Sequence, residues 1–428
     1  MNEPIEFQSP QTRRKGDSMN MSGIRSRQFG RWISTLAVLV LLILTRSTLS
    51  WAVDLGNGFN LTSVIYFDFT QASGDHFDTG SSKNITDDQA NKNIGLANGF
   101  HTTRIYVNLL KEVNDQLSFR ITTDQMTIRA DGNTEATPFG LSGFGGAGRS
   151  NLFIKFAYAQ YKLSPALMIR AGLTQTPWIA TEEERWGYRF LRPVFWDEQG
   201  ALVASDMGVA AVGTFFDKLI GYHFMFSNGE GYQNTSPANS SDGRGYAGQG
   251  RIDLNVLPGL TLSAFGLKET VHNGLSGWNP TREVFFAMYA HPLFRIAAEY
   301  IMADDHGDNN PVSLPTTPNS ASGSKGLNTG LGTSRFDQGR GYGGWAWVHI
   351  PGIESVGIFG RFYSIKPNTA TDAGKMTEAN AGISYEVLKE LIVAIDDTII
   401  SQKLLNLSDG SIETFRDNII GARAQFSF

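Results

Sequence analysis

The most distinctive charged stretch of the chain begins at Thr181, which is followed by three consecutive glutamates. A threonine with a glutamate three residues later has the form of a capping box, and acidic residues stabilise the positive end of a helix. The pattern therefore predicts a short helix over 182–191. Pro193 is expected to end it, because the residue before a proline disfavours helical geometry.

This predicted helix would carry one charged stripe. At 100° per residue, the stripe contains Glu182, Arg185, Arg189 and Arg192. Trp186 and Phe190 share another flank of the helix. The stripe could bind a small anion or a polar solute. The arginines could instead pair with Glu182, Glu184 and carboxylates of the surrounding strands.

Other patterns with chemical potential are weak. Cys is absent, which excludes disulfides and thiolate sites. The run GFGGAG at 143–148 matches a nucleotide-binding spacing, but no βαβ pattern surrounds it, so we interpret it as a loop tip. Asp304, Asp305, His306 and Asp308 could hold a divalent cation, although the polar loop that follows favours solvated side chains. No nucleophile elbow accompanies the Ser and His residues. We therefore expect no enzyme, no cofactor and no bound metal.

The elements that would position the charged residues alternate with a period of two. In the last stretch, 418–428, Ile420, Ala422, Ala424, Phe426 and Phe428 fall on one side, and polar residues fall on the other. The same pattern predicts sixteen strands, at 59–71, 103–109, 117–124, 152–161, 167–173, 202–215, 220–227, 249–256, 260–267, 284–290, 294–302, 344–350, 356–365, 377–387, 391–399 and 418–428.

The connections between these strands alternate strictly between short and long. Short turns contain Pro, Gly, Asp or Lys, whereas long polar segments fall at 72–97, 125–150, 174–200, 228–247, 269–282, 303–342, 366–375 and 401–416. This sorting is typical of a transmembrane antiparallel β-barrel, in which the last strand pairs with the first. A soluble all-β protein is the alternative. Aromatic residues at strand ends, Trp345, Trp347, Tyr342, Tyr385, Phe426 and Phe428, suggest interfacial girdles.

Residues 1–52 are expected to be a cleaved secretory signal, and 53–428 the barrel domain. Basic residues precede the apolar run 33–44, and small residues flank Trp51 where a signal peptidase would cut. The alternative is a membrane anchor, but twelve helical residues rise only about 18 Å, short of the roughly 30 Å hydrocarbon layer. Met19 and Met21 are alternative starting points for translation.

If the barrel is correct, charged residues on the strands must face inward, because an ionised group costs roughly 2–4 kcal/mol on the lipid face. The basic residues predicted to line the interior are Arg104, Arg120, Lys155, Arg170, Arg251, Arg295, Arg361 and Arg423. The acidic ones are Asp68, Asp124, Asp253, Glu299, Glu378, Glu386 and Asp396. This near balance predicts a transverse field across a water-filled pore, and the arginine stripe adds a mild anion preference. The net charge of −5 provides no basic surface for nucleic acid.

The signal, the alternating strands, the terminal Phe428 and the third long segment together resemble bacterial outer-membrane porins. The stretch IRAGLTQTP at 169–177 is similar to the approach to the constriction loop of general-diffusion and phosphate-selective porins. The resemblance implies passive diffusion of small hydrophilic solutes, a third long loop folded into the lumen and a homotrimer. In that arrangement Trp186 and Phe190 would hold the predicted helix on the inner wall, and the charged stripe of Glu182, Arg185, Arg189 and Arg192 would form the pore constriction. It also implies contact with outer-membrane lipid and lipopolysaccharide, and recognition of Phe428 by the barrel-assembly machinery. A scaffold or sheath for a partner protein, or a surface adhesin, is the alternative function.

Overall fold

The computed structural model describes residues 53–74, 99–127, 150–229, 231–232, 246–270, 279–305, 336, 338–405 and 411–428. The predicted signal 1–52, the glycine run at 143–148, His306 and Asp308 lie outside the described residues. The strands are β1 (Val53–Gly56), β2 (Phe59–Gly74), β3 (Gly99–Glu112), β4 (Leu117–Thr127), β5 (Ser150–Ser164), β6 (Leu167–Gln175), β7 (Ser205–Phe215), β8 (Ile220–Ser227), β9 (Tyr246–Leu257), β10 (Leu260–Thr270), β11 (Thr281–His291), β12 (Phe294–Asp304), β13 (Gly339–Ile350), β14 (Ile353–Lys366), β15 (Met376–Leu388), β16 (Leu391–Leu405) and β17 (Ile412–Ser427).

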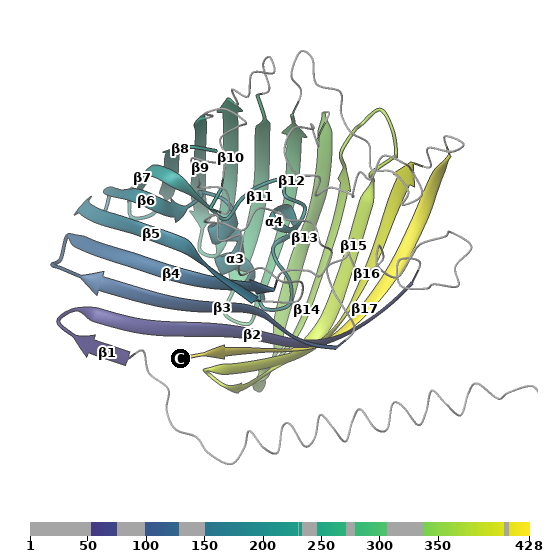
Figure 1. Ribbon diagram of the computed structural model, residues 1–428, viewed down its shortest axis with the longest axis horizontal. Helices are drawn as coiled ribbons and strands as arrows, with labels where there is room; N and C mark the ends of the chain where they lie inside the picture. Colours follow the sequence, from purple (N-terminus) through teal and green to yellow (C-terminus); the bar gives the residue numbers. More distant parts are fainter. Residues whose placement is uncertain are drawn as a thin grey trace, which may run out of the picture. The chain divides into compact units, whose positions relative to one another are not determined.

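Strands β2 to β17 form a closed antiparallel barrel of sixteen strands (Figure 1). Each strand pairs with its neighbours in the chain, and the ring closes where β17 pairs with β2, from Asp417 opposite Gly74 to Ser427 opposite Val64. The predicted antiparallel β-barrel and its number of strands are therefore confirmed. The short strand β1 was not predicted. It pairs with β2 beyond Phe428, which exchanges two backbone hydrogen bonds with Ser63.

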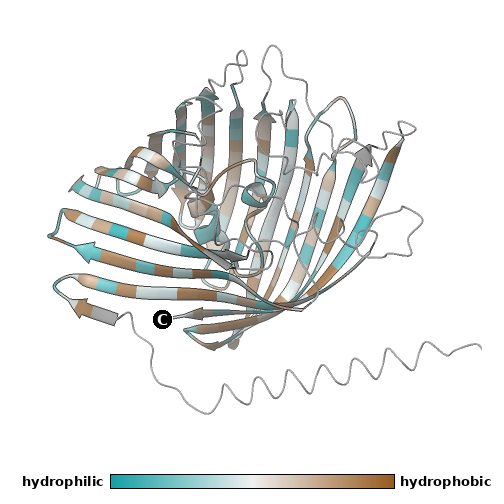
Figure 2. Cartoon of the chain, viewed as in Figure 1, coloured by the Kyte–Doolittle hydropathy of each residue, from teal (hydrophilic) through white to brown (hydrophobic). Residues whose placement is uncertain are grey.

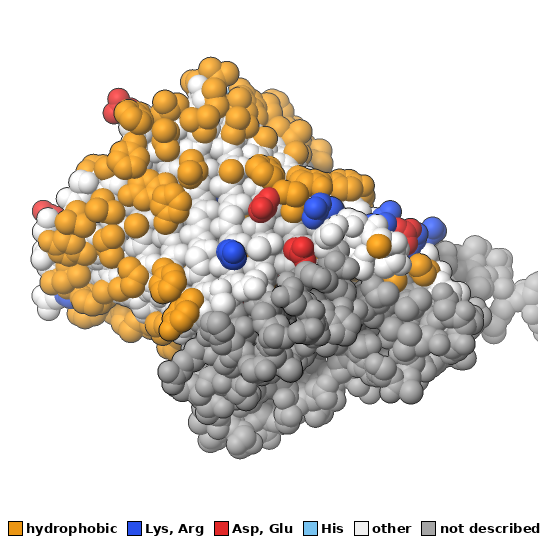
Figure 3. All heavy atoms as spheres, turned by 90° about the horizontal axis from the view of Figure 1, so that it is seen from above, with side chains coloured by type: hydrophobic (Ala, Val, Ile, Leu, Met, Phe, Trp, Pro, Cys, Tyr) orange, Lys and Arg blue, Asp and Glu red, His pale blue; other side chains and the backbone are white. Residues whose placement is uncertain are grey.

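Most outward-facing positions of the wall are apolar. On β16, Ile395 and Ile399 are about half exposed, and Asp396 and Thr398 are buried. Asp397, which lies between the two isoleucines, is an exposed exception. Figure 2 shows this alternation along the strands, and Figure 3 shows one face on which hydrophobic side chains dominate. Such a largely apolar exterior suits lipid rather than water. Among the helices within the described ranges, none is long and apolar enough to cross a membrane.

The inward-facing positions divide into two regions. From β10 to β14 many of them are large and apolar, and Phe265, Phe286, Ile301, Trp345 and Phe359 are buried there. Around the rest of the ring, the buried strand positions carry more polar than apolar side chains, and many of the polar ones are charged. The apolar region was not predicted. Apolar side chains on the inner side of a water-filled barrel would be exposed to water, which is unfavourable. Another part of the protein is therefore expected to cover this apolar region.

The assignment of Trp345 and Trp347 to an interfacial girdle was wrong. Trp345 is buried on the inner side, and Trp347 packs against inward-facing Arg295 and Tyr188. Strand β13 is rich in glycine, so its sequence carries few side chains from which the inward and outward sides can be told apart. Tyr342 and Tyr385, in contrast, are about half exposed on the outer side.

The closure of the barrel is held by a buried group of charges. Arg423 on β17 forms ion pairs with Asp396 on β16, at 2.5 Å, and with Asp68 on β2, at 3.0 Å. All three side chains are almost completely buried. His101 on β3 lies 2.9 Å from the other oxygen of Asp68. The group therefore ties the last strand to the first.

We expect Arg423→Ala to destabilise the barrel by about 3–5 kcal/mol, because it leaves two buried carboxylates without their cation. The measurement is the urea midpoint of the folded-to-unfolded transition, followed by the mobility shift of unheated samples in gel electrophoresis. Arg120→Ala is the control, since within the described ranges Arg120 donates to the neutral side chains of Asn108 and Thr122 and has no carboxylate partner. Equal midpoints for the two variants would contradict the assignment.

Candidate functional site: the segment between β6 and β7

Residues 176–204 connect β6 to β7 and contain the two helices α3 (Ile179–Trp186) and α4 (Phe195–Glu198). Figure 1 draws both helices within the ring of strands. The helix predicted over 182–191 was wrong in its boundaries and in its cap. Helix α3 begins after Trp178 without a side-chain cap, and it ends where Gly187 adopts a left-handed conformation with φ of 75°.

The physical reasons are local. Thr181 does not cap, because its hydroxyl bonds to the carbonyl of Pro177 and accepts a bond from Arg251. A glycine at the position after a helix readily takes the left-handed conformation that ends it. Arg189 and Arg192 therefore lie beyond α3, and the predicted stripe on one helix does not exist.

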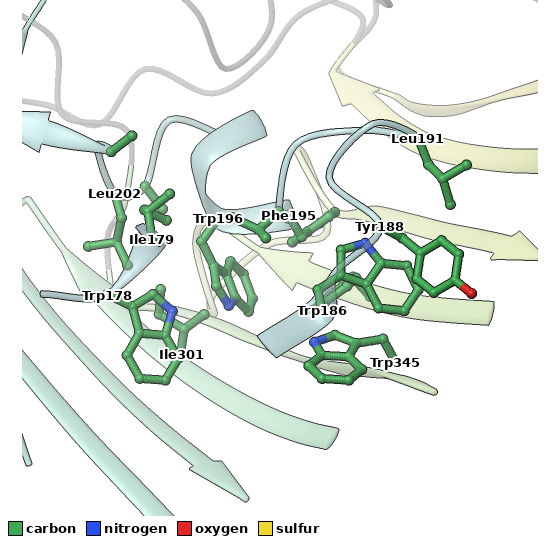
Figure 4. Close-up of a cluster of buried hydrophobic side chains, with 14 of the residues drawn as sticks. Trp178, Ile179, Trp186, Tyr188, Leu191, Phe195, Trp196, Leu202, Ile301 and Trp345 are labelled. Carbon is green, nitrogen blue, oxygen red and sulfur yellow. The ribbon is translucent and has the colours of Figure 1, made fainter. Parts of the chain in front are cut away.

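The segment contacts the apolar inner region of the wall through its aromatic residues (Figure 4). Trp186 lies over Trp345 of β13, with ring centroids 5.2 Å apart. Phe195 stacks on Tyr363 of β14 at 4.6 Å. Trp178 packs on Phe265 and Phe286 of β10 and β11, within 6 Å of each. Burial of each such side chain stabilises by roughly 1.5–3 kcal/mol, so the segment is firmly attached.

Phe190 contacts a part of the wall outside the apolar inner region of β10 to β14. It is buried, and its ring lies 6.4 Å from that of Tyr66 on β2. Both aromatic residues predicted to hold the helix to the wall, Trp186 and Phe190, are thus buried against wall aromatics, although Phe190 lies beyond the helix.

Four arginines of the wall bind backbone carbonyls of the segment. Arg251 of β9 donates to Pro177, Arg282 of β11 to Ala201, Arg295 of β12 to Arg185 and Arg361 of β14 to Pro193. Arg251, Arg295 and Arg361 were predicted to line the pore. These three arginines do face inward, but they donate hydrogen bonds to the segment. Arg282 was not predicted to line the pore.

The four residues predicted to form the constriction have partners within the protein. Glu182 is buried and accepts a bond from Trp178. The partners of the three arginines are Asp253 for Arg185, Glu183 for Arg189, and Glu198 with Glu378 for Arg192. The pairing alternative weighed from the sequence named Glu182, Glu184 and wall carboxylates. The observed set shares with it only the wall carboxylates, Asp253 and Glu378.

The wall from β3 to β6 carries a second set of cations, and only one of them is neutralised. Arg104 pairs with buried Asp124 at 2.6 Å. In the described part of the chain, Arg120, Lys155 and Arg170 have no carboxylate within ion-pair distance. Each instead lies over an aromatic ring. We call these three residues the ring-seated cations.

The contacts of the ring-seated cations preserve their charge. Arg120 lies 4.9 Å from the centroid of Phe156, Lys155 lies 4.7 Å from that of Tyr106, and Arg170 lies 5.5 Å from that of Tyr158. An aromatic face attracts and positions a cation but adds no opposing unit charge. Lys155 also sits at a β-bulge, where one extra residue of β5 faces the Thr122–Thr123 step of β4. The bulge lets both Lys155 and Phe156 face inward.

The segment and this wall influence each other electrostatically. Burial by itself would raise the pKa of Glu183, yet the positive charges of Lys155, Arg189 and Arg104 hold that pKa below its usual value. For Asp197, burial wins and the pKa is raised, although Arg189 and Lys155 oppose the rise. Two charged surfaces thus face each other, with Glu183, Arg189 and Asp197 on one and Arg104, Lys155 and Asp124 on the other.

Comparison with solved structures identifies the architecture. An anion-selective porin from Comamonas acidovorans aligns with a TM-score of 0.55 at 10% identity, over 86% of this chain and 99% of that one. OmpF of Salmonella typhi, in complex with daunomycin, gives 0.54 at 15%, over 87% and 98%. The channel DcaP of Acinetobacter baumannii gives 0.53 at 13%, over 89% and 100%. This chain has the porin fold. Neither a protein-family model nor a curated protein matches its sequence.

Within this porin fold, the predicted wall charges can be compared with the structure only by the side of the wall on which they lie, and their role in lining a pore stays a prediction. Each predicted pore-lining residue lies on an inward-facing position: Arg104, Arg120, Asp124, Arg170, Arg251, Arg295, Glu299, Arg361 and Arg423. Asp197 and Glu198 were missed, because the predicted helix ended before them. The dipeptide Trp196-Asp197, apolar then acidic, was the available signal.

Proposed function

We propose that this barrel resides in the bacterial outer membrane and forms a water-filled channel for passive diffusion of small hydrophilic solutes. Residues 176–204 narrow the lumen, and the solute path runs between this segment and the wall from β3 to β6. The single observation that carries the proposal is the closed sixteen-stranded barrel with a largely apolar outer side and charged side chains on its inner side. Such a wall separates an aqueous interior from lipid.

The channel prefers anions mildly, and the ring-seated cations are the source of that preference. The arginines of the segment are compensated by carboxylates, so their net effect on a passing ion is small. Arg120, Lys155 and Arg170 keep their charge and lie on three adjacent strands, β4 to β6. A row of uncompensated cations raises the local concentration of anions. The proposed source of the anion preference is therefore this set of wall residues and not the arginine stripe predicted from the sequence.

The assembly is proposed to be a homotrimer in contact with lipid and lipopolysaccharide, and Phe428 is proposed as the residue that the barrel-assembly machinery recognises. The solved structures that this chain resembles include one titled as a trimer, OmpT of Vibrio cholerae. A sheath for a partner protein fits less well. The segment with Trp178, Trp186 and Trp196 occupies interior space that such a partner would need.

The experiment is reconstitution of the purified protein in a planar bilayer. We expect stepwise conductance increments and, in a salt gradient, a reversal potential on the anion side. The test variant is the Lys155→Glu, Arg170→Glu double variant, which should insert equally well and move the reversal potential to the cation side. Absence of conductance steps from correctly folded protein would overturn the channel, and a cation-side potential for the natural chain would overturn the selectivity.

A further inference from the structure

Two carboxyl groups meet beneath the segment, away from the proposed solute path. Glu182 of α3 and Glu299 of β12 are both buried. Trp178 donates its indole N–H to Oε2 of Glu182 at 3.0 Å, and Trp196 of the α4 helix donates to Oε2 of Glu299 at 2.6 Å. The two remaining oxygens share the hydroxyl of Tyr363 on β14. It lies 2.7 Å from Oε1 of Glu299 and 3.4 Å from Oε1 of Glu182.

The number of available protons limits these bonds. A tyrosine hydroxyl has one proton to donate, and the shorter distance assigns it to Glu299. The contact between Tyr363 and Glu182 is then a hydrogen bond only if Glu182 carries a proton and donates it to the phenolic oxygen. Without that proton, two carboxylates would share one donor in a buried site, where like charges repel strongly.

The surrounding charges do not replace the missing proton. Arg361 of β14 is the cation that influences the pair, but it is bonded to Glu378 and Pro193 and paired with Glu198. Arg192 of the segment is likewise paired with Glu198 and Glu378.

The remaining charged side chains of α3, α4 and β12 are engaged elsewhere or exposed. Arg185 binds Asp253, Glu183 binds Arg189, Asp197 lies near Arg189, and Arg295 binds backbone of α3. Glu184 is exposed. Within the described ranges, no cation is bonded to Glu182 or Glu299.

We propose that Glu182 and Glu299 hold one proton between them at neutral pH, and that this proton latches both helices of the constriction segment to β12 and β14. Removal of the proton at alkaline pH would place a second negative charge in the site and loosen the segment. The latch joins both helices to the wall because Trp178 precedes α3, Trp196 lies in α4, and Glu299 and Tyr363 belong to the barrel.

The direction of the pH effect follows from the environment of Glu182. Burial, together with the neighbouring Glu299, raises the pKa of Glu182 well above its usual value. A carboxyl with a raised pKa in the docked state binds a proton that the released state would lose. Docking is therefore strongest at low pH. It weakens as the pH rises from the ordinary glutamate range to the raised value, and it changes no further beyond that value.

The first test is infrared spectroscopy of the folded barrel in detergent. A protonated carboxyl has a C=O band separate from that of carboxylates. We expect such a band at neutral pH, its disappearance on alkaline titration, and its loss in Glu182→Gln and in Glu299→Gln. Glu184→Gln is the matched control on the same helix and should keep the band. Absence of the band in the natural chain at neutral pH, or its persistence in both variants, would overturn the proposal.

The second test is the open-channel current noise of reconstituted protein between neutral and alkaline pH. The natural chain and Glu184→Gln should become noisier as the pH rises. Glu182→Gln should stay quiet, because an amide can donate to Tyr363 without titrating. Identical pH dependence in all three proteins would refute the latch. This reading rests on the proposed channel, whereas the infrared band does not, so a failure of conduction and a failure of the latch are separable.

Discussion

Replacing Lys155 by Glu is expected to move the reversal potential from the anion side to the cation side. Lys155 is buried at the bulge of β5 and interacts electrostatically with Glu183 and Asp197. Among the residues that the structure describes, it has no carboxylate within ion-pair distance. The substitution changes the charge at the proposed constriction by two units. Even with strong screening by water, one unit charge several ångströms from the path changes the energy of a passing ion by about 1 kcal/mol, or about five-fold in permeability. Two units should therefore change the anion-to-cation ratio by more than ten-fold.

The control for this experiment is Lys218→Glu, which makes the same charge change at an exposed turn between β7 and β8. That variant should keep the natural reversal potential. Lys155→Gln should give an intermediate value, and it guards against misfolding caused by a new buried acid. If Lys155→Glu folds and keeps its anion preference, the wall from β3 to β6 does not set selectivity.

Replacing Trp186 by Ala is expected to detach the segment 176–204 partially while the barrel remains closed. Trp186 is almost completely buried, and its ring packs against Tyr188, Trp345 and Phe359. Deleting a buried tryptophan typically costs about 3–5 kcal/mol. The substitution weakens the docking of the segment and not the barrel, because the hydrogen bonds between strands do not involve this side chain. We expect larger and noisier single-channel currents, and protease cleavage within 187–193.

Tyr342→Ala serves as the matched control, because Tyr342 lies on the same strand as Trp345 but faces outward. It removes an aromatic side chain without opening space on the inner side. Conductance and cleavage should equal those of the natural chain. An unchanged channel in Trp186→Ala would show that the polar bonds from Arg251, Arg282, Arg295 and Arg361 hold the segment without its apolar contacts.

The barrel could be predicted from the sequence because its signal repeats. The apolar side of 418–428 alone does not identify a barrel. Sixteen such stretches, separated by alternating short and long connections, are typical of a transmembrane β-barrel. The inward assignment of charges such as Arg120 and Arg423 followed from the energy of charge in lipid. Strand β1, four residues long, gives no periodic signal of its own.

The site was harder to predict, since the segment takes its structure from the wall it covers. A capping box at Thr181 is a sound local signal, yet Arg251 from a distant strand engages that hydroxyl. Whether Arg189 faces a solute or Glu183 depends on contacts across the ring, which no local spacing encodes. The apolar inner positions near Trp345 could likewise not be explained before the structure showed that Trp186 packs over them.

The ion-paired group at the closure also constrains the order in which this protein can mature. Asp68 and Arg423 lie 355 residues apart in the chain. An unfinished wall that has entered lipid would carry Asp68 at an open edge, where His101 would be its one remaining ion-pair partner among the described residues. Insertion of the strands into lipid one at a time is thus disfavoured. The first strand must remain in water or bound to a chaperone until the last strand pairs with it. Completion of the chain, rather than formation of its first hairpins, commits the molecule to the membrane.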